Sequence, residues 1–415
     1  MNGTERTSHD IVIVGGGAAG ISVAASILRR RPRADIAIIE PCQTHYYQPG
    51  WTLVGGGVFD LAQTSRPMAE VIPKGARWLW QAASSFQPNQ NLVVLNDGRR
   101  IAYKVLIAAP GIALDWDAIP GLAETLGRNG VTSNYHRDHA PYTWQLVRQL
   151  GDGATALFTQ PPMPIKCAGA PQKAMYLSCD HWRRSGVLDG MTVAFHTAGA
   201  VLFGVKDYVL ALEDYIARYG VHLCLESRLI AVDGPARQAT FLDKMADGTA
   251  VERTVAFDML HVCPPQVAPS FIARSPLADA AGFVDVDQET LRHRRFANVF
   301  GLGDGCSAPN AKTAAAARKQ APVVALNALA VLDGHDPDAI YDGYGSCPLT
   351  VERGRIVLAE FGYGGKLMPS FPRWFIDGTR PSRLSWFLKE KLLPPIYWHA
   401  MLKGREWLVA PARRR

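Results

Sequence analysis

Apolar and polar positions in the first 40 residues follow two different periods. Residues 9–14, HDIVIV, form a short apolar run that leads through GGGAAG into ISVAASILRR, whose apolar residues recur with helical spacing. A second apolar run, ADIAIIE, ends in Glu40. This pattern predicts a strand, a glycine turn, a helix and a second strand.

The glycines of that turn match GxGxxG. In this motif the first glycine makes the tight turn, the second lets a pyrophosphate approach the backbone, and the third lets the helix pack on the strand. Glu40 follows at the distance expected of an acid that binds the ribose hydroxyls. The alternative is a glycine turn of purely structural use. We predict a dinucleotide site made of Gly15, Gly17, Ala18, Ala19, Gly20 and Glu40, with the phosphates at the helix N-terminus.

Two later apolar runs resemble segments of two-dinucleotide-domain flavoproteins. IAYKVLIAAPG (101–111) runs into a glycine, and NVFGLGDG (298–305) closes with Asp304, which in that superfamily hydrogen-bonds the ribityl chain of FAD. Lys312 and Thr313 begin the helical pattern that follows, and a lysine at a positive helix end suits a reduced flavin anion. The resemblance implies FAD at the N-terminal site. An ordinary turn at GLGDG and a solvated first-turn Lys312 are the alternatives.

The chain length of 415 residues exceeds what one hydrophobic core usually supports. We therefore expect an α/β protein with two Rossmann-like domains and a C-terminal amphipathic helical tail. The expected divisions are a discontinuous FAD-binding Rossmann domain at 9–112 and 266–345, a second Rossmann-like domain at 113–265 that carries Cys167, and a membrane-associating region at 346–415 that carries Cys347.

The net charge of +7 is concentrated in that tail. Residues 366–415 hold 11 Lys and Arg against 3 Asp and Glu, which is +8, so the other 365 residues sum to −1. The segment PSRLSWFLKEKLL places apolar residues on one helical face. After a proline break, PPIYWHAMLKGREWL shows the same combination of basic, apolar and aromatic residues. Basic residues with aromatic ones predict a helix in the membrane surface rather than a nucleic-acid site. A helical hairpin packed on its own protein or on a dimer mate is the alternative.

Two further features of the apolar pattern bear on the cellular location of the protein. MNGTERTSHD contains no apolar stretch of a secretory signal, so we expect a reducing compartment. The longest apolar stretch, APVVALNALAVL, is too short to cross a bilayer. The expectation is a peripheral protein on the cytoplasmic face of a bacterial inner membrane.

The seven cysteines contain no CxxC pair, so no metal site is expected. A second GxGxxG is also absent, because the strand ATALFT (154–159) is followed by QPPMPIKCAGAPQKAMYLSC. Cys167 stands in its place, ahead of a helix that could begin near Pro171 and beside Lys166, and both features favour a thiolate. Cys347, in a glycine-bearing turn that ends in Pro348, is its natural partner. Each cysteine alone would more often be a buried structural residue or an idle thiol.

Several long segments together resemble the sulfide:quinone oxidoreductase family, most closely the type found in mitochondria and many proteobacteria. The resemblance implies that Cys167 and Cys347 form a redox disulfide or trisulfide. Hydrosulfide would attack this bridge, with Cys347 the persulfide carrier and Cys167 the thiolate toward the flavin, although the sequence does not fix that order. These segments are HYYQPGWTLVGGG, PIKCAGAPQKAMYLS, LFGVKDY, SPLADAAGFVDVD, NVFGLGDG, AKTAAAA and DGYGSCPLTVERGRIVLAEF.

The same resemblance assigns partners. It adds Gln48 and a backbone contact near Ala83 to the FAD contacts at Asp304 and Lys312, and names Phe361 for the quinone pocket. FAD should be non-covalent, because HYYQPG lacks the tethering cysteine of flavocytochrome relatives. The sulfur acceptor could be glutathione, sulfite, cyanide or sulfide, and a homo-oligomer stays open. The remaining cysteines, Cys42, Cys179, Cys224, Cys263 and Cys306, are expected to be structural, with Cys306 nearest the flavin.

Two other functions remain open from sequence alone. A type II NADH dehydrogenase would have a similar fold, but it needs the second GxGxxG and does not need the two cysteines. A non-catalytic flavin-binding sensor of sulfide or persulfide would retain both the fold and the cysteines.

Overall fold

The fold is known from a computed structural model that describes residues 7–414. The prediction about a secretory signal concerned residues 1–10, of which 1–6 lie outside the described residues. Between residues 7 and 414, no helix is both long enough and apolar enough to cross a membrane.

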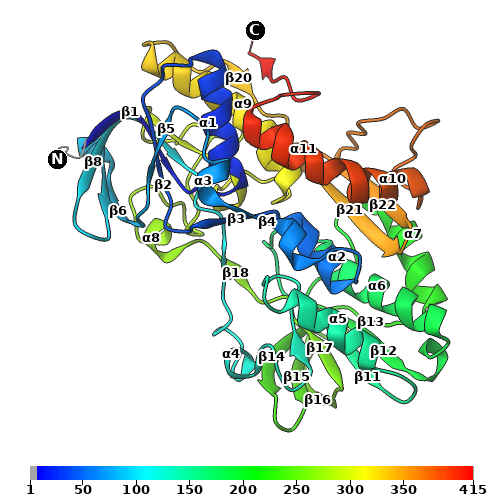
Figure 1. The fold of residues 1–415 in the computed structure, drawn as a ribbon. Coiled ribbons are helices and arrows are strands. Elements are labelled where there is room, and N and C mark those ends of the chain that lie inside the picture. The colour runs from blue at the N-terminus through cyan, green and yellow to red at the C-terminus, as the bar shows by residue number, and fades with distance from the viewer. Residues whose placement is uncertain (1–6, 415) are drawn as a thin grey trace.

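One seven-stranded sheet forms the first half of the molecule (Figure 1). Its strands run in the order β5-β2-β1-β8-β7-β6, and β19 pairs in parallel with β8. The 298–305 segment therefore returns to the sheet of the N-terminal strand, as predicted. The glycine turn leads into α1 (Ala18–Arg30), which packs beside α9 (Ala314–Leu332). The strands are β1 (Ser8–Val14), β2 (Ile36–Ile39), β5 (Ala76–Leu79), β6 (Ala83–Gln87), β7 (Leu92–Leu95), β8 (Arg100–Ala108) and β19 (Val299–Gly301).

A five-stranded parallel sheet, in the order β10-β17-β11-β12-β13, forms the second half. Helices α5 to α7 accompany it, and an antiparallel sheet of β14, β15 and β16 lies beside it (Figure 1). The bounds are β10 (Val131–Thr132), α5 (Ala140–Gln149), β11 (Thr155–Gln160), α6 (Ala170–Ser185), β12 (Thr192–Thr197), α7 (Lys206–Arg218), β13 (His222–Cys224), β14 (Ser227–Asp233), β15 (Gln238–Lys244), β16 (Ala250–Ala256) and β17 (Met259–His261).

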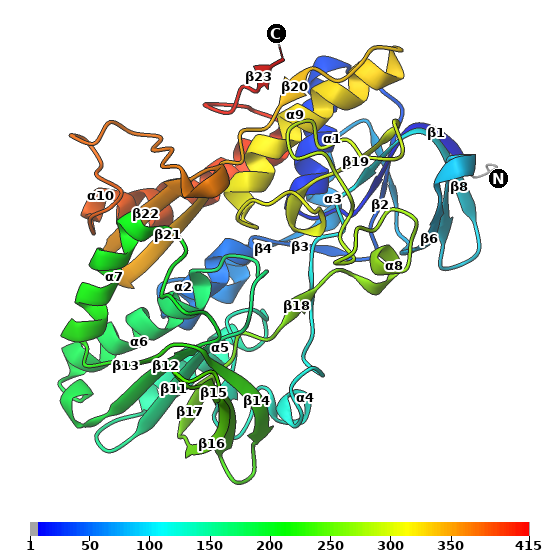
Figure 2. The same ribbon diagram turned by 180° about the vertical axis from the view of Figure 1, so that it is seen from behind.

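Two short strands join these halves. Strand β9 (Ala113–Leu114) leaves the first sheet, and β18 (Gln266–Val267) returns to it, and the two pair antiparallel (Figure 2). The remaining short elements are β3 (Thr44–Tyr46), α2 (Trp51–Gly55), β4 (Ser65–Pro67), α3 (Met68–Val71), α4 (Leu122–Thr125) and α8 (Ser270–Ala273).

A hairpin of β21 (Gly345–Glu352) and β22 (Arg355–Phe361) packs against α6. Cys347 lies within β21 and pairs with Ala359, so the prediction that it sits in a glycine turn was wrong. Pro348 is tolerated there because β21 pairs with a single strand, which leaves its other edge free of ladder hydrogen bonds.

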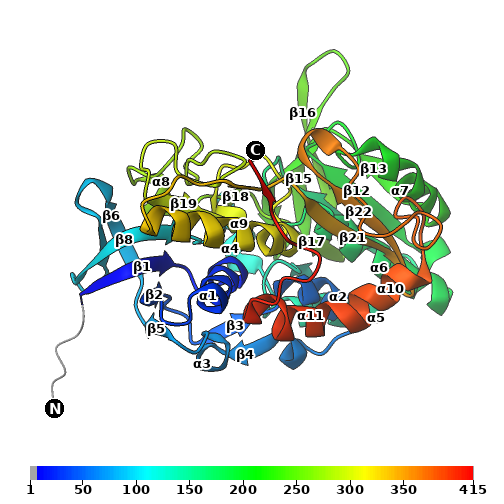
Figure 3. The same ribbon diagram turned by 90° about the horizontal axis from the view of Figure 1, so that it is seen from above.

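The tail helix is continuous where the sequence predicted a proline break. It comprises α10 (Arg383–Phe387), a π-helical turn at Leu388–Leu392 and α11 (Leu393–His399). The two prolines occupy the first turn of α11, where proline is tolerated because an N–H there has no partner within its own helix. Helix α11 lies near α1 (Figure 3), and Tyr397 and Trp398 are buried rather than facing solvent.

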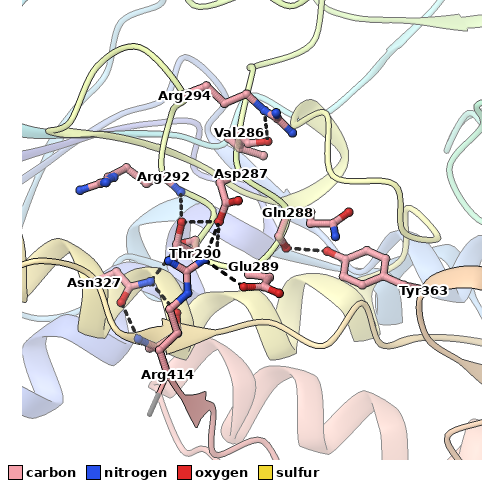
Figure 4. Close-up of polar contacts among 11 residues, drawn as sticks. Val286, Asp287, Gln288, Glu289, Thr290, Arg292, Arg294, Asn327, Tyr363 and Arg414 are labelled. Atoms are coloured by element: carbon pink, nitrogen blue, oxygen red, sulfur yellow. Dashed lines mark hydrogen bonds and ion pairs between the residues drawn. The ribbon is translucent and has the colours of Figure 1, made fainter.

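The C-terminus is tied back to the first half of the molecule. Strand β23 (Ala412–Arg413) pairs with β20 (Ala339–Ile340). Beside it, the Arg414 guanidinium donates to Glu289 at 2.9 Å, and the buried Asn327 side chain of α9 donates to Thr290 O at 2.9 Å (Figure 4). The Arg414 contact holds the last described residues against the loop that precedes β19, and the Asn327 contact holds α9 against the same loop.

Candidate active site

The glycine turn after β1 has the shape of a phosphate cradle. Gly15 adopts a φ of +106°, and a Cβ atom there would collide with the Ala109 carbonyl, whereas a Cβ on Gly20 would collide with Gly15 O. A Cβ on Gly17 would meet nothing within 4 Å. No side chain caps the N-terminus of α1, where Ala18 and Ala19 begin the helix. The turn is thus tight where it packs and open where an anion would approach.

Glu40 lies at the end of β2 beside this turn. Its carboxylate accepts hydrogen bonds from Gly16 N and Cys42 N, both at 2.7 Å. The structure therefore brings the predicted acid to the glycine loop and fixes its orientation.

Asp304 and Lys312 face each other after β19. The half-buried Asp304 carboxylate accepts no hydrogen bond from the described residues, and burial raises its pKa, while the charges of Lys312 and Lys166 lower it. Lys312 is 8% exposed, and its ammonium donates to Asp304 O at 2.7 Å and to Cys306 O at 2.9 Å. Lys312 is therefore not the solvated lysine that the sequence left as an alternative.

Gln48 reaches the cysteine loop, whereas Ala83 does not. The Lys166 ammonium donates to Gln48 Oε1 at 2.8 Å. Ala83 is buried in β6, where it pairs with Leu95. No described contact joins Ala83 to the other predicted cofactor residues, so its role stays a prediction.

Cys167 and Cys347 meet between the two halves of the molecule, with their Sγ atoms 3.7 Å apart. Cys167 lies in the loop between β11 and α6 and adopts a φ of +51°, an uncommon conformation for a residue with a side chain. Its amide donates to Lys312 O at 2.8 Å, and the Tyr135 hydroxyl donates to its carbonyl at 3.2 Å. The loop conformation is held by contacts on both sides, which is typical of functional sites.

Gly169 permits this close approach. A Cβ atom at this position would lie 2.6 Å from Cys347 Sγ and would also collide with Leu349. Only a glycine lets β21 come this near to the start of α6. No local pattern indicates this requirement for glycine, because the constraint comes from a strand far along the chain.

A buried lysine sets the charge of the thiol pair. The Lys173 ammonium, 2% exposed, donates to Cys167 Sγ at 3.1 Å. The hydrogen bond from Cys347 and the positive charge of Lys173 hold the pKa of Cys167 well below its usual value, although burial opposes them. The hydrogen bond with Cys167 and burial raise the pKa of Cys347. Lys166 was predicted as the activating cation, but its ammonium points to Gln48, and Lys173 takes that role.

A second buried lysine comes from the tail. Lys389 was expected on the polar face of the tail helix, but it is 3% exposed and donates to Pro49 O at 2.9 Å. Burial first, and then the charge of Lys173, lower its pKa to about 7, while Cys167 and Cys347 raise it. The tail helix thus places a cation near the cysteine pair.

Comparison with known proteins identifies the family. The chain is 42% identical over 397 residues to the mitochondrial sulfide:quinone oxidoreductase of Dictyostelium discoideum, covering 95% of this chain and 86% of that protein. It is 38% identical over 401 residues to the mitochondrial sulfide:quinone oxidoreductase of Mus musculus, covering 97% and 88%. The chain belongs to the sulfide:quinone oxidoreductase family.

The fold agrees with this membership. The solved sulfide:quinone oxidoreductase of Aquifex aeolicus superposes with a TM-score of 0.80 at 18% identity, covering 98% of this chain and 97% of that one. This likeness concerns the fold alone, which is the two-Rossmann-domain flavoprotein fold predicted from the sequence. No family model matches the chain. Membership and fold together imply a flavin cofactor.

Phe361 and the other cysteines occupy varied positions in this member of the sulfide:quinone oxidoreductase family. Phe361 lies on the same face of the β21–β22 hairpin as Cys347 and packs edge-on against Phe203. It therefore contacts the hydrophobic core that the hairpin shares with the second half of the molecule. Its role toward quinone stays a prediction. Cys179, Cys263 and Cys306 are buried, Cys224 is half-buried and Cys42 is exposed. Within residues 7–414 no group of three or more metal-ligating side chains is placed to hold an ion.

Proposed function

We propose that the protein is a flavin-dependent sulfide:quinone oxidoreductase, which oxidises hydrogen sulfide to sulfane sulfur and passes two electrons to quinone. The observation that carries the proposal is the pair of cysteines 3.7 Å apart with a lysine on one of them. Nucleophilic sulfur chemistry requires a thiolate, and the hydrogen bond from Cys347 and the charge of Lys173, which hold the pKa of Cys167 well below its usual value, favour that form.

The position of Lys173 beside Cys167 supports an order for the reaction. In the oxidised enzyme Cys167 and Cys347 would be bridged, directly or through one additional sulfur. Hydrosulfide attacks Cys347 Sγ of a direct bridge, the bond to Cys167 breaks, and the products are a Cys347 persulfide and a Cys167 thiolate. Cys167 is the better leaving group because the Lys173 ammonium, 3.1 Å from Cys167 Sγ, stabilises the departing negative charge. The sequence left this order open.

The cycle closes in two further steps. A nucleophilic acceptor attacks the outer sulfur of the persulfide, the S–S bond breaks, and Cys347 leaves as a thiolate. A thiol acceptor becomes a persulfide, sulfite becomes thiosulfate, and cyanide becomes thiocyanate. Loss of two electrons from the two cysteines then restores the bridge. FAD, when bound, supplies the two-electron acceptor between the cysteines and quinone. Glutathione, sulfite, cyanide and sulfide remain the candidate acceptors.

We propose non-covalent FAD at the N-terminal site. The open space over Gly17 and the uncapped start of α1 fit the pyrophosphate. The Asp304 carboxylate, which has no partner among the described residues, fits the ribityl group. Glu40 would bind the ribose, and Gln48 and Lys312 would lie toward the flavin ring. The FAD domain would comprise 9–112 and 266–345, the second domain 113–265 and the C-terminal region 346–415.

We propose peripheral membrane association through the tail. The tail exposes large apolar side chains, which suits a surface that meets lipid, where quinone is dissolved. The two relatives described above carry a mitochondrial name, and the cytoplasmic face of a bacterial inner membrane stays a prediction. The exposed residues are Trp374, Phe375, Leu384, Phe387, Leu392, Trp407 and Leu408.

The test is an anaerobic titration of the FAD-loaded protein with sulfide and, separately, with NADH, followed by a soluble quinone. We expect the flavin spectrum to bleach with sulfide but not NADH, and to recover with quinone. Cys167→Ser should abolish the response, whereas Cys179→Ser, which removes a buried cysteine outside the pair, should retain it. Bleaching by NADH alone would support a type II NADH dehydrogenase. Bleaching by sulfide without reoxidation by quinone would support a sensor.

A further inference from the structure

A buried histidine joins the tail helix to the glycine loop. His45 lies in β3 and is 2% exposed. Its Nδ1 atom lies 3.0 Å from Gly16 O, and its Nε2 atom lies 2.7 Å from the hydroxyl of Tyr397 in α11. One imidazole ring therefore connects the loop after β1 with a helix near the C-terminus.

The chemistry of the partners fixes the direction of both hydrogen bonds. A carbonyl oxygen only accepts, so Nδ1 of His45 carries a proton and donates to Gly16 O. Burial lowers the pKa of His45 to about 4, although the hydrogen bond with Gly16 raises it, so the ring is neutral near neutral pH. In this neutral tautomer Nε2 is an acceptor, and the Tyr397 hydroxyl donates to it. Tyr397 thereby selects the tautomer that donates to the glycine loop.

The carbonyl of Gly16 belongs to the same peptide unit as the N–H of Gly17. This peptide is trans, because the only cis bond among the described residues joins Met163 and Pro164, so Gly17 N–H points away from Gly16 O. Gly16 is buried and Gly17 is exposed, and no described group accepts a hydrogen bond from Gly17 N. Since the carbonyl points inward to His45, the N–H points to the open side of the loop, where the pyrophosphate is proposed to lie.

A second contact restrains the same part of the loop. Gly16 N donates to Glu40 Oε2 at 2.7 Å. Two successive glycines rotate freely unless they are held, and the bonds to Glu40 and His45 hold Gly16 at both its N–H and its C=O. Hydrogen bonds in a chain also polarise one another, so the bond from His45 strengthens Gly17 N–H as a donor.

We propose that His45 and Tyr397 are positioning residues for the pyrophosphate of FAD, and that the tail helix supports the cofactor loop through them. The inference rests on the FAD site proposed above. Both residues act through the Gly16–Gly17 peptide rather than by contact with the cofactor. Docking of α11 and retention of FAD therefore favour each other.

The test follows the release of FAD from the loaded full-length protein by the rise in flavin fluorescence. Tyr397→Phe removes one hydroxyl and should speed release about threefold to tenfold, which is the effect of one neutral hydrogen bond. Tyr103→Phe is the matched control, because Tyr103 is also a buried tyrosine, but its hydroxyl has no partner among the described residues. The control should release FAD at the wild-type rate.

Two variants of His45 separate the role of its donor from a general loss of packing. His45→Asn keeps an N–H donor close to the position of Nδ1, whereas His45→Leu keeps none, so the asparagine variant should release FAD more slowly than the leucine variant. Phosphorus NMR of the bound FAD gives a second readout. A pyrophosphate resonance should shift in Tyr397→Phe but not in Tyr103→Phe, which a general loss of stability would not produce.

The outcomes distinguish this inference from the proposed cofactor. Release of FAD from Tyr397→Phe at the wild-type rate, with unshifted phosphorus resonances, would overturn the inference and leave the FAD site intact. If His45→Leu does not fold, the comparison of Tyr397→Phe with Tyr103→Phe decides alone. A full-length wild type that retains no FAD would instead overturn the proposed cofactor, and this inference with it.

Discussion

Replacing Lys389 with methionine should stabilise the protein at low and neutral pH. The pKa of this lysine falls from an ordinary value of 10.5 to about 7, chiefly because of burial. Each pH unit of that difference corresponds to about 1.4 kcal/mol, so below pH 7 the buried ammonium costs about 5 kcal/mol relative to the unfolded chain. Loss of the hydrogen bond to Pro49 returns about 1 kcal/mol. The expected net gain is about 4 kcal/mol.

The sign of the pH dependence follows from the lowered pKa. Between pH 7 and 10.5 the unfolded chain binds the proton that the folded protein has lost, so the stability of the wild type rises with pH across this window. Lys389→Met cannot show this rise. The difference in stability between variant and wild type should therefore be largest at pH 6 and shrink toward pH 10.

Urea unfolding at pH 6, 8 and 10, followed by tryptophan fluorescence, measures this difference. Lys391→Met is the matched control, because Lys391 lies on the same π-turn with an exposed side chain that pairs with Glu390. The control should differ from the wild type by less than 1 kcal/mol at each pH. A pH-independent difference for Lys389→Met, or a loss of stability at pH 6, would refute the argument that a desolvated ammonium lies at this position.

Three other changes test neighbouring features. Gly169→Ala should keep the fold, as judged by circular dichroism, but push Cys347 away and lower the rate of sulfide-dependent flavin reduction at least tenfold, because the new Cβ would lie 2.6 Å from its Sγ. Lys173→Met should move the pH midpoint of Cys167 alkylation by iodoacetamide upward, since the thiolate loses its cation; an unchanged midpoint would contradict this. Asn327→Ala should lower urea stability by about 3 kcal/mol, because its fully buried side chain makes three hydrogen bonds to backbone groups, and a loss below 1 kcal/mol would contradict it.

Local pattern was sufficient to predict the glycine loop and strands β1, β2 and β8 of the first sheet, whereas β5, β6 and β7 were not predicted. The strands at 9–14 and 101–111, the turn at Gly15 and the acid at Glu40 all follow from short-range periodicity and spacing. These features are local because a βαβ unit places its ligand groups within one stretch of chain. The closeness of Cys167 and Cys347 was inferred from the absence of a second GxGxxG and from the family resemblance. Local pattern alone does not show which residues far apart in the sequence contact each other.

The cations of the site could not be found in the same way. Lys166 is adjacent to Cys167 in sequence, but the left-handed turn at Cys167 points the chain away, and the first turns of α6 bring Lys173 back to the sulfur. Lys389 was predicted to lie on the polar face of the tail helix, because the argument from helical amphipathicity assumes that every lysine faces solvent. Its burial depends on Tyr47 and Pro49, which belong to a distant loop.

Two energetically unfavourable features, one in the backbone and one in the burial of a side chain, lie at or near the cysteine pair. Cys167 adopts a left-handed backbone conformation that most side chains avoid, and Lys389 gives up most of its hydration. Neither feature improves the stability of the fold, and favourable contacts elsewhere offset the free energy that both cost. Such conflicts between local preference and tertiary structure concentrate at functional sites. The tail helix that carries Lys389 also carries the exposed Leu384, Phe387 and Leu392, so one helix supplies both the charge near the cysteines and the surface proposed to meet the membrane. Truncation at this helix would therefore remove both together.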